Sequence, residues 1–262
     1  MCLILLAWQA HAEYPLVVAA NRDEFFARPS APAAFWSDAP QVCAGRDLEA
    51  GGTWLGISRN QRFAALTNFR EGRQPGDGWR SRGELVAAFL SGSAAPLDYL
   101  AGVADRAADY NGFNLFVGDS DTLAYYANRG GQPPRSLAAG IYGLSNHLLD
   151  TPWPKLASAR RAFAESLPGL PASEPFFTLL ADQEIVPDRH LPETGVSLDW
   201  ERILSAVFVR SASYGTRAST LLMRGIDGRT TLLERSFGAD ARLLGETGAT
   251  FASASTADLN PR

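Results

Sequence analysis

The sequence is poor in the residues that build metal centres and disulfide frameworks. Its 262 residues include two cysteines, Cys2 and Cys43, and three histidines, His11, His147 and His190. Two thiols cannot form a disulfide framework, so a reducing compartment is the simpler expectation. The histidines are scattered, and no His/Cys spacing resembles a metal site. We therefore expect no metal centre and no disulfide scaffold.

An excess of positive charge is also missing. The chain has 24 Lys and Arg residues against 28 Asp and Glu residues, which gives a formal net charge of -4 at pH 7. Nucleic-acid-binding proteins usually carry a strongly basic surface, so this balance argues against a nucleic-acid partner. Lysine is nearly absent, since Lys155 is the single lysine of the chain. We attribute that skew to the codon usage of a GC-rich genome and infer no function from it.

Long hydrophobic runs are absent as well. No stretch approaches the roughly 20 apolar residues that span a bilayer, so we expect no integral membrane segment. The apolar N-terminus has no basic residues before it and breaks at Gln9-Ala10-His11, which is unlike a signal peptide. No repeat, low-complexity tract or linker divides the chain. We therefore predict one cytoplasmic domain over residues 1–262.

Strand and helix patterns alternate along the chain. Two apolar runs, at 3–8 and 14–20, flank a polar turn and predict a hairpin. A second hairpin is predicted over 53–58 and 62–67. The other predictions are helices at 81–90, 96–109, 153–167 and 175–182, strands at 113–117, 122–126, 141–144, 218–223 and 230–235, and loops at 28–40 and 186–198. Ser81 and Glu84 have the spacing of a capping box. This order predicts an α+β fold with two packed sheets and helices outside.

Cys2 carries the strongest chemical signal in the chain. Removal of Met1 would make it the terminal residue, and cysteine is small enough for that removal. Its thiol and α-amine would then be a nucleophile and a base on one residue, with unperturbed pKa values of about 8.5 and about 8. Modest help from nearby positive charge yields a thiolate at neutral pH. The alternative is that Cys2 is simply a small residue of a buried strand.

The segment Asn21-Arg22-Asp23-Glu24 ends the second strand of the first predicted hairpin. In a hairpin, the end of strand two lies beside the start of strand one, which is Cys2. An arginine there lowers the pKa of a thiol, and an aspartate can hold the α-ammonium group of a mobile chain end. The alternative is an ordinary solvated turn.

Two asparagines follow strands in a similar way. Asn68 comes after the strand at 62–67, and Asn146 comes after the strand at 141–144. A neutral amide in such a place can stabilise a developing oxyanion, because it donates without changing its charge. Most asparagines at strand ends only open a turn, so both interpretations stay open for each residue.

Arginine and glycine clusters complete the candidate motifs. One polar segment contains Arg70, Arg73, Arg80 and Arg82. This segment is either a solvated loop or a place for a carboxylate or phosphate of a ligand. Gly51-Gly52-Thr53-Trp54-Leu55-Gly56 lacks the lysine of a P-loop and is interpreted as a tight turn into a strand. Arg217 places one more guanidinium at the start of a late strand.

Together these motifs resemble the NRDE family, the family of the transport and Golgi organisation protein 2. The resemblance rests on an ordered set that covers nearly the whole chain: Met1-Cys2, Asn21-Arg22-Asp23-Glu24, Gly51-Gly52-Thr53-Trp54-Leu55-Gly56, Thr67-Asn68-Phe69-Arg70, Gly143-Leu144-Ser145-Asn146 and Tyr214-Gly215-Thr216-Arg217. That family is similar in turn to the N-terminal-nucleophile hydrolases of the choloylglycine hydrolase and isopenicillin acyltransferase type. The resemblance implies a four-layer αββα sandwich.

The resemblance also implies roles for individual residues. Cys2 would be nucleophile and base, Arg22 and Asp23 would line it, and Asn68 would be the oxyanion donor. Asn146 would be a second active-site asparagine, and Arg217 would match a late active-site arginine. The spacing between the arginine and the aspartate differs from that of the amidases, so this pair is an approximate match.

Two functions follow as expectations. The first is an amidohydrolase or acyltransferase that acts on a linear amide C–N bond through Cys2 and requires no cofactor. The second is a non-catalytic binding or trafficking protein for haem, acyl-CoA or another lipid on the same scaffold, because fold does not fix function. Both take a small molecule as ligand or substrate, and the sequence leaves the oligomeric state open.

Overall fold

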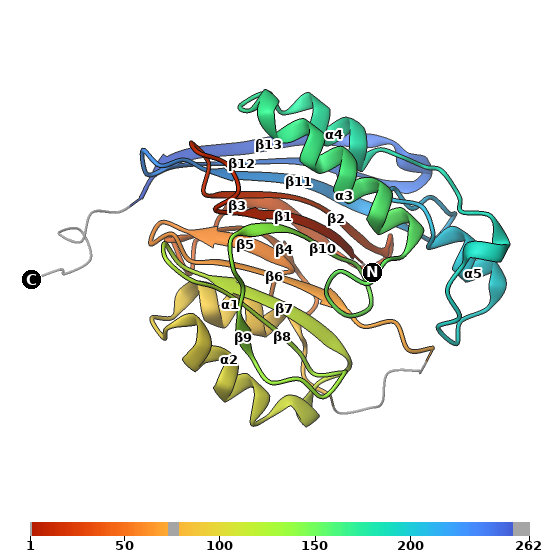
Figure 1. Cartoon of the computed structure of the whole chain (residues 1–262), viewed down its shortest axis with the longest axis horizontal. Helices are drawn as coiled ribbons and strands as arrows, with labels where there is room; N and C mark the ends of the chain where they lie inside the picture. The colour runs from red at the N-terminus through yellow and green to blue at the C-terminus, as the bar shows by residue number, and fades with distance from the viewer. Residues whose placement is uncertain (1, 73–78, 254–262) are drawn as a thin grey trace, which may run out of the picture.

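The computed structural model describes residues 2–72 and 79–253, which form two stacked antiparallel sheets with helices on their outer faces (Figure 1). The first sheet has the strand order β10 (Gly140–Leu144), β1 (Cys2–Trp8), β2 (Leu16–Phe25), β11 (Tyr214–Arg224), β12 (Arg229–Phe237) and β13 (Leu243–Ala252). The second sheet has the order β3 (Ser30–Phe35), β4 (Val42–Asp47), β5 (Leu55–Ser58), β6 (Phe63–Asn68), β7 (Phe113–Gly118), β8 (Leu123–Ala127) and β9 (Arg135–Ser136).

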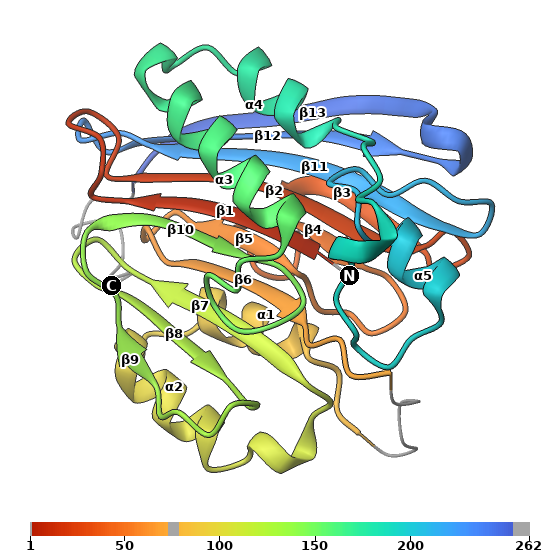
Figure 2. The same ribbon diagram turned by 45° about the vertical axis from the view of Figure 1, so that its right-hand side comes forward.

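The helices cover the two outer faces. The second sheet is covered by α1 (Gly83–Ser91) and α2 (Pro96–Ala104), and the first sheet by α3 (Pro154–Ser166) and α4 (Glu174–Leu180). A short helix, α5 (Leu198–Ile203), lies at the end of the sandwich where β1 begins (Figure 2). No helix within residues 2–72 and 79–253 is both long and apolar enough to cross a bilayer.

The alternation of side chains along β2 explains the layers. Leu16, Val18 and Ala20 point between the sheets, whereas Val17 and Ala19 pack under α3 and α4. Successive side chains of a strand point to opposite faces, so a strand covered on both sides must be apolar throughout. Burying each side chain of Val or Leu size contributes about 1.5–3 kcal/mol. The four-layer αββα sandwich that the sequence predicts is therefore confirmed.

Both predicted hairpins are confirmed, as β1–β2 and β5–β6. The predicted helices at 153–167 and 175–182 agree with α3 and α4 within two residues at each end. The predicted helix at 96–109 is too long, since α2 ends at Ala104 and a short 3-10 turn follows at 107–109. Strands β4 and β13 and the helix α5 had no counterpart in the sequence prediction.

Two further local predictions are wrong. The segment 28–40, expected as a loop, contains β3, which tolerates Pro32 because the register shifts between Ala31 and Ala34 and leaves a bulge there. The capping box also fails, because α1 begins after Arg82 without a side-chain cap. Glu84 instead accepts hydrogen bonds from Tyr110 and Arg80.

Candidate active site

Cys2 opens β1 on the face that points toward the second sheet. The antiparallel β1–β2 ladder pairs Cys2 with Arg22 and Ile4 with Ala20, and Ile4 and Ala20 both lie in the core between the sheets. Cross-strand partners share a face, so the thiol and the Arg22 side chain lie on the same side of the sheet. Cys2 is buried, and this burial raises the pKa of its thiol, while the charge of Arg22 lowers it.

Arg22 is held flat by an aromatic ring. Its guanidinium carbon lies 4.2 Å from the centre of the Trp54 ring, and its Nη2 is 3.8 Å from Asp47 Oδ2. The ring has room because Gly45 lies against it, where a Cβ would overlap the indole. Arg22 is only 5% exposed, so stacking on Trp54 is worth more here than it is at a wet surface.

The Gly51–Gly56 motif sets the position of Trp54. Gly51 has φ +75, a left-handed conformation that glycine adopts without strain, and turns the chain toward β5. A Cβ on Gly52 would overlap the backbone of Gly83 at the start of α1. The interpretation of this motif as a tight turn into a strand is confirmed. Its glycines bring the indole over Arg22 and draw the start of α1 toward the same region.

Asp23 points to the opposite face of the first sheet from Arg22, as consecutive strand residues must. Its Oδ1 accepts a hydrogen bond of 2.7 Å from Thr216 Oγ1, and its backbone carbonyl accepts one of 3.0 Å from the Tyr214 hydroxyl. Burial raises the pKa of the Asp23 carboxyl. The backbone N–H of Asp23 lowers the pKa of the Cys2 thiol, so the two residues are neighbours through the main chain.

The two asparagines and Ser145 join the ends of three strands around Cys2. Thr67 Oγ1 donates to the Ser145 carbonyl at 2.7 Å, and Ser145 Oγ lies 3.4 Å from the Cys2 carbonyl oxygen. Asn146 Nδ2 donates to the backbone oxygen of Asn68 at 3.1 Å. These bonds tie the end of β6 and the residues after β10 to the start of β1. The structure therefore brings Cys2, Asn68 and Asn146 together.

Arg217 lies farther round the sheet. It stands at a bulge of β11, where the register with β2 shifts between Thr216 and Ala218. Its Nη1 donates to the carbonyls of Phe25 and Arg28 at 2.9 and 3.0 Å. It lines a cavity that Arg22 also lines, on a different side from the cleft described next. Its place in the active site stays a prediction.

Two cavities of about 400 Å³ each form a cleft beside Asn68, and Arg22 borders one of them, whereas Cys2 itself lines neither. They share the lining residues Glu24, Asn68, Arg82 and Asn111. One is the more apolar: six of its thirteen lining residues are aromatic or aliphatic, namely Phe25, Phe69, Val196, Trp200, Leu204 and Tyr214. The other is polar and is lined among others by Arg22, Arg28, Asp47, Glu49 and Arg80. The cleft therefore offers an apolar half and a charged half on either side of Asn68.

Arg82 connects this cleft to the thiol. Burial lowers the pKa of Arg82, and the negative charges of Glu24 and of a Cys2 thiolate oppose this effect. Its Nη1 donates to the carbonyl of Gly112 at 2.9 Å. Arg80 and Arg82 of the arginine-rich segment both border the polar half of the cleft, and Arg80 is the more exposed of the two. Arg73 lies outside the described residues.

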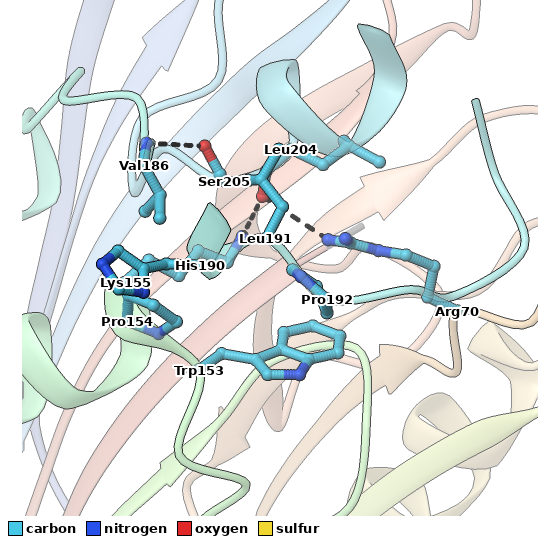
Figure 3. A pocket seen from close by; sticks show the side chains of 10 residues that line it. All are labelled: Arg70, Trp153, Pro154, Lys155, Val186, His190, Leu191, Pro192, Leu204 and Ser205. Carbon is cyan, nitrogen blue, oxygen red and sulfur yellow. Dashed lines mark hydrogen bonds between the residues drawn. The ribbon is translucent and has the colours of Figure 1, made fainter. Parts of the chain in front are cut away.

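Lys155 is a buried cation that the sequence analysis passed over. Its Nζ donates to the Leu204 carbonyl at 2.7 Å, and Arg70 Nη2 lies 3.4 Å from the same oxygen (Figure 3). Burial and the charge of Arg70 lower the pKa of Lys155 to about 8, while Asp23 and Cys2 favour its charged form. The signal was its uniqueness, since every other basic residue of the chain is arginine.

Arg70 has its own carboxylate partner. Its Nη1 lies 2.7 Å from Glu201 Oε2, and both side chains are at most 5% exposed. Glu201 belongs to α5, so this ion pair fixes α5 over the end of β6. Together with Trp153, Arg70 and Lys155 border a space of about 10 Å³, roughly enough for one water molecule. No cluster of three His, Cys, Asp or Glu side chains that could hold a metal occurs in the described part of the chain.

Comparison with known proteins shows which family the chain belongs to. The family model of Transport and Golgi organisation 2 matches residues 1–239. The chain belongs to the Transport and Golgi organisation 2 family. A family member from Bos taurus is 42% identical, with 90% of this chain and 93% of the relative covered. The Drosophila melanogaster member is 27% identical, with 90% and 92% covered. The predicted NRDE-family resemblance is thereby confirmed.

Solved structures similar to this member of the Transport and Golgi organisation 2 family are distant. A Caenorhabditis elegans N-acylethanolamine-hydrolyzing acid amidase ortholog superposes with a TM-score of 0.44 at 13% identity, covering 84% of this chain and 92% of that one. A conjugated bile acid hydrolase from Clostridium perfringens gives 0.41 at 10% identity, with 96% and 92% covered. At this distance nothing about substrate follows from either structure.

Proposed function

We propose that the protein is an N-terminal-nucleophile amidohydrolase or acyltransferase that cleaves a linear amide bond through Cys2. The observation that supports this most directly is the pairing of Cys2 with Arg22 at a strand end that is tied to Ser145, Asn146 and Asn68. A nucleophile, a cation and amide donors are the groups that acyl transfer requires. The proposal depends on removal of Met1, which frees the α-amine of Cys2.

The proposed reaction has two steps. The Cys2 thiolate attacks the amide carbonyl carbon and forms a C–S bond, and the carbonyl oxygen becomes an oxyanion. The C–N bond then breaks, and the α-ammonium group of Cys2 gives its proton to the departing amine. Water, or an acyl acceptor in the transferase version, gives a proton to the now neutral α-amine and attacks the thioester carbonyl carbon. The C–S bond then breaks, the carboxylic acid or the new acyl product leaves, and the α-ammonium group is restored. The thiolate is restored without a cofactor or a redox partner.

Asn68 suits the oxyanion better than Asn146 does. Asn68 borders both halves of the cleft, whereas Asn146 is fully buried and its Nδ2 already donates to the backbone of Asn68. We therefore assign Asn68 as the oxyanion donor and Asn146 as the residue that positions it. The family resemblance implies the same role for Asn68 and makes Asn146 a second active-site asparagine, to which we now give a positioning role.

The positive charges around Cys2 oppose the effect of its burial, although the pKa of the thiol stays raised. Arg22, Arg82 and Lys155 all interact electrostatically with the thiol group, against the negative charge of Asp23. A cation near a thiol favours the thiolate, which is the nucleophilic form. The two halves of the cleft suit a substrate with an apolar acyl group on one side of the amide and a polar or charged amine portion on the other.

Turnover of a panel of fluorogenic acyl amides tests the proposal. The wild-type protein, with Met1 removal verified by intact mass, should release the amine, and Cys2→Ala should lower kcat by at least about 10³-fold. Cys43→Ala is the matched control, because Cys43 is a buried core residue whose pKa is raised to about 11 by burial. Turnover that survives in Cys2→Ala, or in protein that retains Met1, would overturn the mechanism.

A second candidate is non-catalytic binding of an acyl chain or haem. The aromatic half of the cleft favours an apolar ligand, and the relatives bear the name of transport and Golgi organization proteins. Haem has less support than an acyl chain. Within the described residues no histidine lines either half of the cleft, and His190 borders only the 10 Å³ space. An absorbance titration with haem, with Cys2→Ala and His147→Ala as controls, tests this version, and it fails without a spectral shift at micromolar haem.

A further inference from the structure

A cavity of about 320 Å³ lies on the other side of Arg22, between β3 and the strands β11, β12 and β13. Arg22 and Trp54 border both this cavity and the polar half of the cleft, so the stacked pair separates the two spaces. Its other polar lining residues are Ser30, Arg217, Glu234, Ser236 and Thr247. Its apolar lining comes from Ala31, Pro32, Ala218, Phe237 and Leu244.

This cavity gathers buried polar atoms that lack hydrogen-bond partners. Three buried side-chain N or O atoms of its lining have no hydrogen bond: Arg22 Nη1, Arg217 Nε and Thr247 Oγ1. Buried polar groups are nearly always paired, and a buried guanidinium donor without an acceptor is especially unfavourable. Three such atoms around one cavity require acceptors inside it, which water or a ligand can supply.

The charge of the cavity selects the kind of acceptor. Arg22 and Arg217 contribute two positive charges and Glu234 one negative charge. The Glu234 oxygens are already used, since Oε1 accepts from the Ala33 N–H at 2.7 Å and Oε2 from Thr220 Oγ1 at 3.1 Å. Burial also raises the pKa of Glu234, which weakens its opposition to an anion. Two guanidinium donors and a hydroxyl suit a carboxylate, and a net charge near +1 favours a monoanion over a phosphate dianion.

We propose that this cavity binds an organic monoanion, a carboxylate carried on a short aliphatic chain. The carboxylate accepts from Arg22 Nη1, Arg217 Nε and Thr247 Oγ1, and the chain packs against Pro32, Phe237 and Leu244. A cavity of this volume is at the lower end of the range for small-molecule sites, so the ligand is small. The thiol does not line this cavity, and the two are connected through Arg22, which borders the cavity and pairs with Cys2 across the β1–β2 ladder.

Calorimetric titration of the full-length protein with octanoate at pH 7 tests the site, with inorganic phosphate as a second titrant. We expect saturable binding of octanoate and none of phosphate at the same concentration. Thr247→Val should weaken octanoate binding about tenfold, because it removes one hydrogen bond to a charged group. The Thr247 hydroxyl makes no hydrogen bond within the protein, so its removal should weaken ligand binding without breaking a hydrogen bond of the fold.

Further variants test whether octanoate binding depends on the residues that line the cavity. Arg217→Met should weaken binding more than Thr247→Val does, since it removes a charge as well as a donor. Thr250→Val, on the same strand but outside the cavity, should bind like the wild type. Cys2→Ala should also retain octanoate binding. The result of this test is therefore independent of the result of the test for hydrolase activity. The site is refuted by absence of saturable octanoate binding, by equal binding of phosphate, or by unchanged affinity in both Thr247→Val and Arg217→Met.

Discussion

Cys2 and Arg22 face each other across the β1–β2 ladder, on the side of the first sheet that points to the second. This relationship places a cation beside the thiol without any loop having to close over it. The same hairpin sends Asp23 to the opposite face, where it bonds to Thr216. The four-residue motif at 21–24 therefore places a charged side chain on each face of the first sheet, beside the start of β1.

Asn68→Leu should reduce kcat for an acyl amide by about 10²–10³-fold, the usual effect of losing one oxyanion donor. KM should change little, because the lost hydrogen bond forms mainly in the transition state. Steady-state kinetics at fixed pH give both constants. Asn60→Ala, an exposed turn residue, is the control and should leave kcat unchanged. A rise in KM at constant kcat would show that Asn68 binds substrate rather than the oxyanion.

Much of this site could be predicted because it lies within one hairpin. Two all-apolar runs with a short polar turn define β1 and β2, and antiparallel pairing then brings position 22 close to position 2. Asn68 and Asn146 could be proposed for a related reason, since polar residues at strand ends gather at the edge of a sandwich. Their direct contact, through Asn146 Nδ2 and the Asn68 carbonyl, depends on the stacking of the two sheets.

Lys155 and Arg82 could not be placed in this way. Lys155 Nζ donates hydrogen bonds to the backbone carbonyls of residues 204 and 206, which lie about fifty residues later in the chain. No sequence pattern connects these positions. Arg82 reaches the cleft because Gly52 and Gly83 let the start of α1 pack closely against the turn before β5. Tertiary contacts also override local signals, as when Glu84 bonds to Tyr110 and leaves α1 without its capping box.

Gly45→Ala should destabilise the protein by about 1–3 kcal/mol, because the added Cβ overlaps the Trp54 ring and the core is closely packed. The ring has to move away from Arg22, so the intrinsic tryptophan fluorescence should change as well. Urea denaturation measures the first effect and emission spectra the second. Gly102→Ala is the matched control: its Cβ meets nothing within 4 Å, and this helix-interior substitution should stabilise by about 0.5–1 kcal/mol. Equal destabilisation by both changes would contradict the steric explanation.

Glu201→Ala should lower the free energy of unfolding by about 3–5 kcal/mol, because it leaves the buried Arg70 guanidinium without its carboxylate partner. The change also removes the acceptor of the Thr194 N–H. Asp188→Ala breaks an exposed ion pair with Arg202 and serves as the comparison, with an unchanged denaturation midpoint expected. If the two variants lose similar stability, the Arg70–Glu201 pair is not the buried anchor of α5 that its exposure indicates.

Lys155 should make the stability depend on pH in the alkaline range. Its pKa of about 8 in the folded state lies below the ordinary value of 10.5, so the unfolded chain binds more protons between these two values. The free energy of unfolding therefore rises with pH across this window, by about 3 kcal/mol in total from this residue. Below pH 8 the amine is charged in both the folded and the unfolded state. Burial of this charge then lowers the free energy of unfolding by its full amount.

Urea denaturation of wild type and Lys155→Met from pH 7 to pH 10.5 isolates the contribution of Lys155 and the groups coupled to it, because tyrosines and other groups away from Lys155 titrate equally in both proteins. The difference in unfolding free energy between wild type and variant should increase with pH between about 8 and 10.5. Lys155→Arg should remove the same pH dependence, since a guanidinium stays charged throughout this range. Parallel curves for wild type and Lys155→Met would mean that the amine titrates near its ordinary pKa, which would contradict the lowering of that pKa by burial and by the charge of Arg70.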